Sequence, residues 1–250
     1  MKYSISLVIP CYNEELNIQK GVLDKIGNYT QDDKRFSEIL IVDDGSNDNT
    51  KKLIKDKYLD QFPKFKLIEN QHQGKAFAVI TGIMQAKGNY VMFSDIDLAT
   101  PIEESEKLIK HIDSSKPIII GSRNKGRKGA PILRQFMSFG SIIVKTMILG
   151  LQGINDTQCG FKLFEKKTAT TIISYLKVFN NGKSATGSSV SAGFDLEFLF
   201  VAVKKKYPIE EVFVEWKHVE TKNVNFFKDT YESLRDILLI KYYDIMHQYG

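Results

Sequence analysis

Short apolar runs alternate with amphipathic segments through the first half of the chain. Residues 47–57 and 74–87 have the polar and apolar spacing of helices, and the second segment is closed by Gly88. The apolar runs have the length and composition of buried strands and lie at residues 4–10, 38–44, 65–69, 90–93 and 117–121. Strands that alternate with helices at this spacing predict an α/β fold, with a mostly parallel, Rossmann-like sheet flanked by helices.

The second half of the chain has a different pattern. Residues 131–151 predict a long helix with a wide apolar face, either in the core or at an interface with lipid or another subunit. Residues 180–193 are small, polar and rich in glycine, which predicts a mobile surface loop before helix resumes at Phe194. A last helix at 226–249 has an apolar stripe that we expect to pack against its own domain: Phe227, Tyr231, Leu234, Leu238, Tyr242, Ile245 and Tyr249.

Composition and charge fit one globular α/β domain. Of the 250 residues, 42% are hydrophobic and 26% charged, which excludes disordered and fibrous classes. The net charge of +5 suits phosphate-bearing ligands or an anionic membrane surface. Because the sequence has no basic tract and no motif of a known nucleic-acid-binding fold, we expect no nucleic-acid partner. Cys11 and Cys159 lack the spacing of a disulfide or a zinc site, which favours a cytoplasmic location.

The sequence predicts no membrane span. The first apolar run is cut by Pro10 and is too short for the core of a signal peptide. No window reaches the roughly 18 uninterrupted apolar residues that a span requires. The nearest, residues 132–151, is interrupted by Arg134, Gln135 and Lys145. Any membrane contact should therefore be peripheral.

Two aspartates directly follow the apolar run at residues 90–93. If the backbone stays extended there, the carboxylates of Asp95 and Asp97 point to the same side and can share one divalent cation. A second interpretation is structural: Asp95 is a turn residue and Asp97 caps the helix that Pro101 begins. The run itself does not decide between these two hypotheses.

Three predicted strands end in acidic or polar clusters, at residues 10–14, 43–46 and 95–97. Because parallel strands end at the same edge of a sheet, we expect these clusters to converge. Carboxylates there can bind the ring N–H of a base or ribose hydroxyls, while the last pair holds a cation against a diphosphate. The chain lacks GxGxxG, GxxxxGK[ST] and GxSxG motifs, which disfavours dinucleotide oxidoreductases, P-loop proteins and α/β-hydrolases. The histidines lack metal-ligand spacing and are interpreted as surface or packing residues: His72, His111, His218 and His247.

Taken together, these motifs resemble an inverting glycosyltransferase of family 2 with the GT-A fold. The resemblance is carried by residues 10–14 (PCYNE), 43–46 (DDGS), Asn70 with 74–76 (GKA), and 95–98 (DIDL). Further motifs resemble the dolichyl- and polyprenyl-phosphate hexosyltransferase branch, most closely the dolichyl-phosphate β-glucosyltransferases: residues 121–123 (GSR), Arg134 with Ser138, 156–162 (DTQCGFK) and 195–197 (DLE). The resemblance covers residues 4–220.

The resemblance also implies a division of the chain. Residues 1–220 would be the catalytic domain, with a nucleotide-sugar-binding half at 1–125. The acceptor-binding half would lie at 126–220 and include the mobile loop at 180–193. Residues 221–250 would form a separate amphipathic helix.

Site residues follow from the same resemblance. Asp95 and Asp97 would hold Mg²⁺ or Mn²⁺, and Asp156 would stabilise charge near the reacting centre. Arg123, Arg134 and Ser138 would bind the phosphate of the acceptor, for which arginines are well suited because they stay charged. The nucleotide-sugar donor would meet Pro10, Tyr12, Glu14, Asp43, Asp44, Gly74, Lys75, Asp95, Ile96 and Asp97.

The resemblance implies a metal-dependent enzyme that moves a hexose to dolichyl or polyprenyl phosphate with inversion, with UDP-glucose as the favoured donor. Two alternatives remain: a family 2 enzyme with another donor such as GDP-mannose or a saccharide acceptor, and a non-catalytic nucleotide-sugar-binding subunit. Many relatives carry membrane helices that this chain lacks, so we expect peripheral contact at the cytosolic face of a membrane. The 132–151 helix, the 180–193 loop, the terminal helix, a membrane partner or a homo-oligomer could provide it.

Overall fold

A seven-stranded sheet organises the part of the chain that the structure describes. The structure is a computed structural model that describes residues 3–112, 116–123, 148–179, 193–217, 219 and 226–250. The strands are β1 (Ile5–Cys11), β2 (Phe36–Asp43), β3 (Phe65–Glu69), β4 (Tyr90–Ser94), β5 (Ile118–Arg123), β6 (Phe161–Glu165) and β7 (Ile209–Val214). Their order is β3-β2-β1-β4-β6-β5-β7, and every neighbouring pair is parallel except the two that involve β6. The predicted α/β class and the five predicted strands are therefore confirmed.

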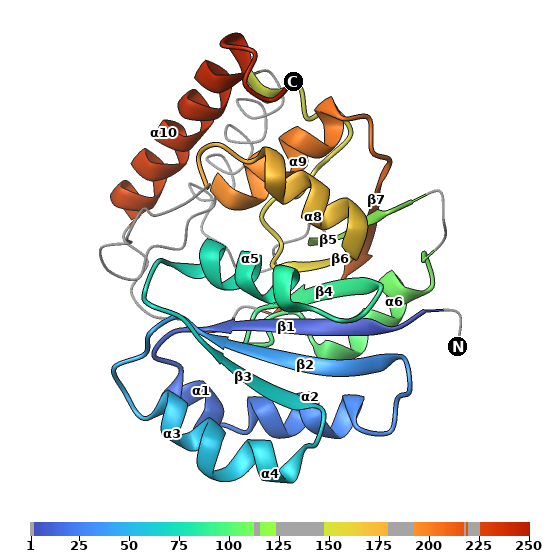
Figure 1. The fold of residues 1–250 in the computed structure, drawn as a ribbon, viewed down its shortest axis with the longest axis vertical. Helices are drawn as coiled ribbons and strands as arrows, with labels where there is room; N and C mark the ends of the chain where they lie inside the picture. Colours follow the sequence, from blue (N-terminus) through green and yellow to red (C-terminus); the bar gives the residue numbers. More distant parts are fainter. Residues whose placement is uncertain (1–2, 113–115, 124–147, 180–192, 218, 220–225) are drawn as a thin grey trace.

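Helices cover both faces of the sheet (Figure 1). One face carries α5 (Lys75–Gln85), α8 (Lys166–Tyr175), α9 (Gly193–Lys204) and α10 (Phe226–Ile245). The other carries α1 (Glu15–Gln19), α2 (Val22–Thr30), α3 (Thr50–Leu53), the π-helical turn η1 (Ile54–Tyr58), α4 (Leu59–Gln61), the 3₁₀ turn η2 (Ile102–Glu104) and α6 (Ser105–Ile109). The strands are consequently buried on both sides, as their uninterrupted apolar runs predict.

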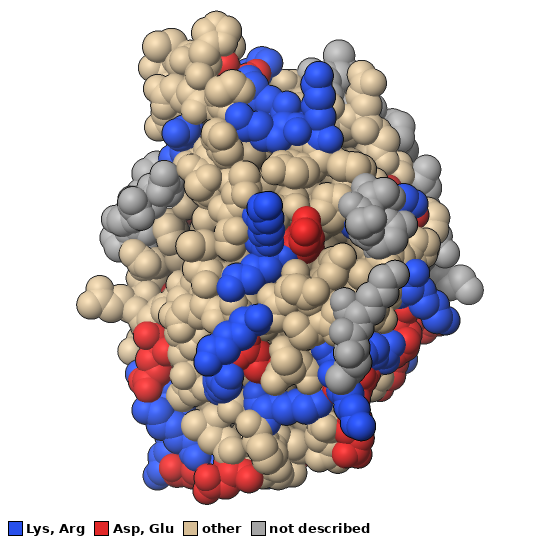
Figure 2. Space-filling view, turned by 45° about the vertical axis from the view of Figure 1, so that its right-hand side comes forward, with Lys and Arg blue, Asp and Glu red and all other residues tan. Residues whose placement is uncertain are grey.

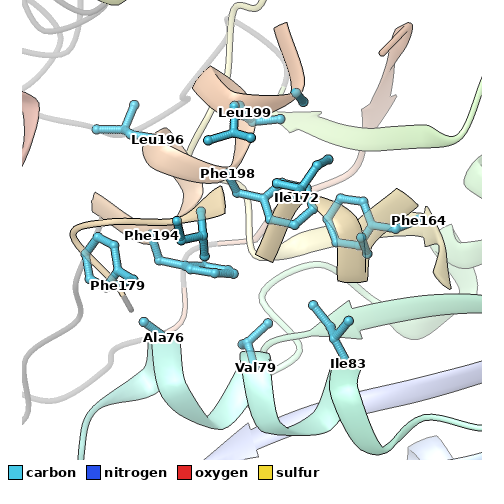
Figure 3. Packing of buried hydrophobic residues seen from close by; sticks show 14 of the residues in the cluster. Ala76, Val79, Ile83, Phe164, Ile172, Phe179, Phe194, Leu196, Phe198 and Leu199 are labelled. Carbon is cyan, nitrogen blue, oxygen red and sulfur yellow. The ribbon is translucent and has the colours of Figure 1, made fainter. Parts of the chain in front are cut away.

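Alternate side chains of the central strands enter two separate cores. In β1, Leu7 and Ile9 point to the core with α2, whereas Val8 points to the core with α5. On the α5 side, aromatic rings of β6 and α9 fill the space above the helix (Figure 3). Phe164 and Phe198 lie with ring centroids 4.7 Å apart, and Phe194 lies 5.9 Å from Phe198. The contacts among these rings hold α9 against the sheet.

The sequence did not predict β6 and β7. β6 runs antiparallel between β4 and β5, pairing Phe93 with Lys162 and Ile120 with Lys162. Its run FKLFE places a lysine among apolar residues, yet Lys162 is only 1% exposed. A buried lysine breaks the hydrophobic pattern on which strand prediction depends. The antiparallel strand matters because it brings residues 156–162 to the edge where β1 and β4 end.

A buried carboxylate fastens the end of the chain to the body. Glu197 in α9 is fully buried and accepts hydrogen bonds from the backbone N–H groups of Lys177, Val178 and Phe179 at 2.6–3.0 Å. It also accepts one from the hydroxyl of Tyr249 at 2.6 Å. One side chain thus holds α9, the segment after α8 and the residue before the C-terminus.

The packing of α10 contradicts the sequence prediction for its apolar stripe. Ile237 and Ile240 pack into the core, whereas Tyr231, Leu238 and Ile245 are 69%, 63% and 64% exposed. The stripe therefore faces away from its own domain, with Tyr249 buried beyond the end of the helix. The reason is that the opposite side of α10 carries apolar residues of its own, and these pack in one core with α9.

Several predicted features fall outside the described residues. They include the 131–151 helix up to residue 147, the 180–193 loop up to residue 192, and the side chain of Phe227. Within the described residues, no helix combines the length and the apolar character needed to cross a bilayer.

Helix α5 approaches β1 so closely that it needs a glycine. A Cβ atom at Gly82 would lie 2.3 Å from Cγ1 of Val8. We expect Gly82→Ala to lower the free energy of unfolding by about 1–3 kcal/mol, because overpacking forces the helix away from the sheet. Urea unfolding followed by circular dichroism measures this change.

Two further variants isolate the cause. Gln85→Ala, at the exposed end of the same helix, should change the stability by less than about 0.5 kcal/mol. Val8→Ala combined with Gly82→Ala should be less destabilising than the sum of the single changes, because the clash is removed. Strict additivity would contradict the steric explanation.

Candidate active site

The first two acidic clusters meet at the end of β1 and β2. The backbone N–H of Asn13 donates to Oγ of Ser46 at 2.9 Å, and that of Asp44 donates to the carbonyl of Cys11 at 2.9 Å. Asp43 is fully buried, and its carboxylate accepts from the N–H groups of Gly45 and Ser46. The convergence predicted for these clusters is thus present in the structure.

Asp44 organises the loop that follows β3. Its carboxylate is 1% exposed and accepts from the N–H of Gly74 at 2.7 Å, the N–H of Gln73 at 3.1 Å and the ring of His72 at 2.7 Å. The ring of His72 stacks on Tyr12, with centroids 4.0 Å apart and planes 13° from parallel. Asp44 therefore positions a Tyr12–His72 surface beside the start of α5, a place for His72 that its sequence context did not indicate.

The third cluster is a turn, which corrects the extended conformation considered above. The N–H of Leu98 donates to the carbonyl of Asp95 at 3.3 Å, and Leu98 has a φ of 50°. The carboxylate of Asp97 accepts from the N–H of Ala99 at 3.0 Å. Alternation along a strand therefore does not orient the two aspartates. The turn does, and it matches part of the structural alternative.

Lys75, the first residue of α5, forms an ion pair with Oδ1 of Asp95. Burial alone would lower the pKa of Lys75, but the negative charge of Asp95, with Asp195 and Asp97 nearby, raises it. Gly160 lies against the same carboxylate from the other side, where a Cβ atom would be 2.2 Å from Oδ2 of Asp95. Asp95 is thus confined between a cation and a glycine.

The chemistry around Asp95 and Asp97 fits a divalent cation. Burial, together with the neighbouring charge of Asp95, raises the pKa of Asp97, which means that the two carboxylates repel each other. Oδ1 of Asp95 is buried and, among the described atoms, receives no well-oriented hydrogen bond in spite of the ion pair with Lys75. No group of three His, Cys, Asp or Glu side chains surrounds them in the described part of the chain. The other ligands would then be diphosphate and water oxygens, as Mg²⁺ prefers.

Arg123, at the end of β5, is held by Asp156. Its Nε and one terminal nitrogen donate to the two carboxylate oxygens at 2.6 and 2.8 Å, and its backbone N–H donates at 3.1 Å. The guanidinium also lies 5.7 Å from the ring centroid of Trp216. Burial opposes ionisation of Asp156, but the hydrogen bonds and charge of Arg123 lower the pKa of Asp156. Asp156 is therefore an anion that orients an arginine.

Sequence reasoning named Lys162 and Asp195 only as parts of motifs. Nζ of Lys162 donates to Oδ1 of Asp195 at 2.7 Å and to the carbonyl of Cys159 at 2.5 Å, and it lies 5.2 Å from the ring centroid of Phe93. This buried cation joins β6 to the first turn of α9. A lysine inside an apolar strand was the signal that could have revealed it.

The remaining predicted site residues are distributed unevenly. Pro10 is buried in β1 opposite Val42, and the side chain of Ile96 lies in the core at 5% exposure. Glu14 is half-buried and accepts from the side chain of Asn17 at 2.6 Å. Arg134 and Ser138 lie outside the described residues, so their predicted contact with an acceptor phosphate stays a prediction.

A depression on another side of the molecule is separate from this site. It has a volume of about 560 Å³ and is lined by Ser4, Gly88, Asn89, Glu165, Thr170 and the lysines Lys87, Lys166 and Lys167. Figure 2 brings forward the side where β1 begins, and Lys and Arg are spread over the upper half of that face with few acidic residues. The residues that line this depression include none of the carboxylates or arginines of the candidate site.

Comparison with known proteins agrees with this geometry. Residues 6–169 match the family described as Glycosyl transferase family 2. The chain belongs to this family. It is a glycosyltransferase, as the strand-end motifs predicted.

Relatives named dolichyl-phosphate beta-glucosyltransferase are similar over most of their length. Those from Saccharomyces cerevisiae and Homo sapiens are each 31% identical to this chain, over 95% of it and 74% of the relative. One from Trichomonas vaginalis is 37% identical, over 86% of this chain and 66% of the relative.

Solved structures share the fold of this chain at low sequence identity. Glucosyl-3-phosphoglycerate synthase from Mycobacterium tuberculosis, in complex with UDP, superposes with a TM-score of 0.71 at 16% identity. The match covers 96% of this chain and 80% of that one. The same enzyme with Mn²⁺, UDP-glucose and phosphoglyceric acid gives a TM-score of 0.69 at 15% identity. This similarity confirms the predicted GT-A architecture.

The Arg123–Asp156 pair predicts a pH-dependent stability. Because the pKa of Asp156 is lower in the folded chain than its unfolded value of about 3.9, the pair stabilises the fold above that pH. This contribution is lost as the pH falls through the lower folded value. We expect Asp156→Asn to cost about 1–3 kcal/mol at neutral pH and progressively less below about pH 4.

Urea unfolding at a series of pH values tests this expectation. Asp60→Asn, at an exposed position in α4, is the matched control and should behave like the wild type throughout. A cost of Asp156→Asn that stays constant from neutral to acidic pH would show that the charge of Asp156 is not what stabilises this region.

Proposed function

We propose that this protein transfers a hexose, glucose from UDP-glucose, to dolichyl or polyprenyl phosphate with inversion of the anomeric centre. The observation that carries the proposal is the similarity to relatives named dolichyl-phosphate beta-glucosyltransferase over 95% of the chain. The grouping of Asp95, Lys75, Asp156 and Arg123 at one sheet edge supports it, because the reaction joins two phosphate-bearing substrates.

The donor would bind where β1, β2 and β4 end. Asp44 fixes the loop that carries His72 and Gly74, and the stacked Tyr12 and His72 would contact the nucleoside. Lys75, kept positive by Asp95, would offset charge on the diphosphate. Asp95 and Asp97 would hold Mg²⁺ or Mn²⁺, which supplies stabilisation of the negative charge that develops on the departing nucleoside diphosphate. Crystals of the mycobacterial synthase with Mn²⁺ and UDP-glucose agree with this use of the fold.

The acceptor would bind beside Arg123. Asp156 occupies Nε and one terminal nitrogen of this guanidinium, so the other terminal nitrogen is the edge that can donate to a phosphate. We infer that Arg134 and Ser138 add to this contact. A phosphate monoester already carries a nucleophilic anionic oxygen at neutral pH, and the step therefore needs alignment rather than proton removal.

The state of the carboxylates favours this acceptor over a saccharide. Attack by a neutral hydroxyl group requires a general base near the anomeric carbon. Asp156 is bound to Arg123 with a lowered pKa, and Asp195 is bound to Lys162. A carboxylate that is neutralised by a cation is a weak base. Both groups are better suited to position their cationic partners.

The two halves of the chain would divide these tasks. Residues 1–125 would bind the nucleotide sugar and residues 126–220 the acceptor. The proposed acceptor is anchored in a membrane, and the proposed donor is a water-soluble nucleotide sugar. The protein would therefore work at the cytosolic face of a membrane through peripheral contact. A membrane partner or a homo-oligomer could assist it.

Transfer assays with isosteric variants test the proposal. With Mg²⁺ or Mn²⁺, UDP-[¹⁴C]glucose and a short polyprenyl phosphate, the wild type should form a labelled glycolipid. We expect Asp95→Asn and Asp97→Asn to lower kcat/KM by about a hundredfold or more, because each removes charge that holds the cation. Gly160→Ala should have a similar effect by displacing the carboxylate of Asp95.

The controls separate the alternatives. Asp56→Asn, at an exposed position in the turn η1, should retain full activity. GDP-mannose in place of UDP-glucose, and a saccharide in place of the lipid phosphate, should give no product. Product with a saccharide alone would refute the lipid acceptor, and metal-dependent UDP binding without transfer to any acceptor would indicate a non-catalytic subunit.

A further inference from the structure

Helix α10 presents an apolar stripe to solvent. Leu234 and Tyr242 are 47% and 56% exposed and join Tyr231, Leu238 and Ile245 on this stripe. At about 100° per residue these five side chains fall within an arc of about 80°, on the side opposite the buried Ile240. Ile245 lies fourteen positions after Tyr231, so the stripe is about 21 Å long at 1.5 Å per residue. A continuous apolar row of this kind usually marks a docking surface.

The area of the stripe argues against a second copy as its occupant. A strip about 21 Å long and about 10 Å wide covers on the order of 200 Å². A stable protein–protein interface buries about 800 Å² on each partner, several times more. A lipid surface has no such requirement, because an amphipathic helix inserts its apolar row individually among the acyl chains.

The charges beside the stripe favour an anionic lipid surface. On the helical wheel, Arg235 and Lys241 flank the stripe on its two sides, and Arg235 is 54% exposed along its side chain. Their acidic partners, Asp236 and Asp244, are 2% and 18% exposed and lie toward the domain. The rim of the stripe therefore directs cations outward and keeps anions inward, which is the arrangement that binds acidic headgroups.

The position of α10 relates the stripe to the site. Figure 1 shows α10 along the outer edge of the molecule, beginning on the side where β1 ends. The candidate site lies at the ends of β1, β2 and β4. A flat lipid surface on this side could thus contact the helix while remaining near the site.

From these observations we propose that the exposed stripe of α10 docks on a bilayer that contains anionic phospholipid, and so brings the site to a membrane-anchored acceptor. The choice of a membrane rests on the proposed lipid-phosphate acceptor. The docking surface itself rests on exposure, area and rim charge.

Vesicle sedimentation with the full chain tests the docking. We expect the wild type to bind vesicles of phosphatidylcholine with phosphatidylserine more strongly than vesicles of phosphatidylcholine alone. Leu234→Glu combined with Leu238→Glu should weaken binding by at least about tenfold, because two apolar side chains no longer enter the lipid. Lys241→Gln should reduce the preference for phosphatidylserine several-fold. Met84→Glu, at an exposed position in α5, is the matched control and should bind as the wild type does.

Three further measurements make the result decisive. Circular dichroism should show the same melting temperature for the double variant and the wild type, because both leucines are exposed. Equal vesicle binding by the two proteins would overturn the proposal. So would sedimentation equilibrium that shows a wild-type dimer and a monomeric double variant, because the stripe would then join two copies. Vesicle binding without transfer to a short soluble polyprenyl phosphate would refute the proposed function and leave the docking intact.

Discussion

Repulsion between carboxylates at one sheet edge is the constraint that shapes this protein. Asp44 and Asp95 directly follow β2 and β4, Asp156 lies before β6 at the same edge, and each of the three has a partner that offsets its charge or donates hydrogen bonds to it. Asp44 accepts hydrogen bonds from the backbone N–H of Gly74 and binds the ring of His72, whereas Asp95 is paired with Lys75 and Asp156 with Arg123. The neighbouring pair Asp95 and Asp97 still carries an excess of negative charge, which adds to burial in raising the pKa of Asp97. That excess is what a divalent cation would relieve.

The antiparallel strand β6 is the means by which distant segments reach this edge. A purely parallel sheet would bring only loops that follow its strands. Because β6 runs in the opposite direction, the residues before it, from Asp156 to Gly160, arrive beside the end of β4. The same strand carries Lys162, whose buried charge binds Asp195 and so positions the start of α9. Donor and acceptor chemistry can then share one edge.

The sequence was sufficient for the first half of the fold and for the convergence of its acidic clusters, because uninterrupted apolar runs and strand-end motifs are local signals. It was insufficient where tertiary pairing decides. The burial of Lys162 conceals β6, and the turn at Asp95–Leu98 depends on contacts with Gly160. The apolar residues on both sides of α10 left open which side would face the core, and the wrong side was predicted. The partners of Asp44 and Asp156 lie too far along the chain for spacing to reveal them.

The bond between Glu197 and Tyr249 has a mechanical consequence. The residue before the C-terminus is bonded to a carboxylate in α9, and the first turn of α9 carries Asp195, which binds Lys162 and lies near Lys75. Movement of α10 relative to the body would therefore strain the bond between Tyr249 and Glu197. The strain would act on α9, whose first turn carries Asp195. A displacement at the outer surface of the enzyme would thereby act on the helix that carries Asp195.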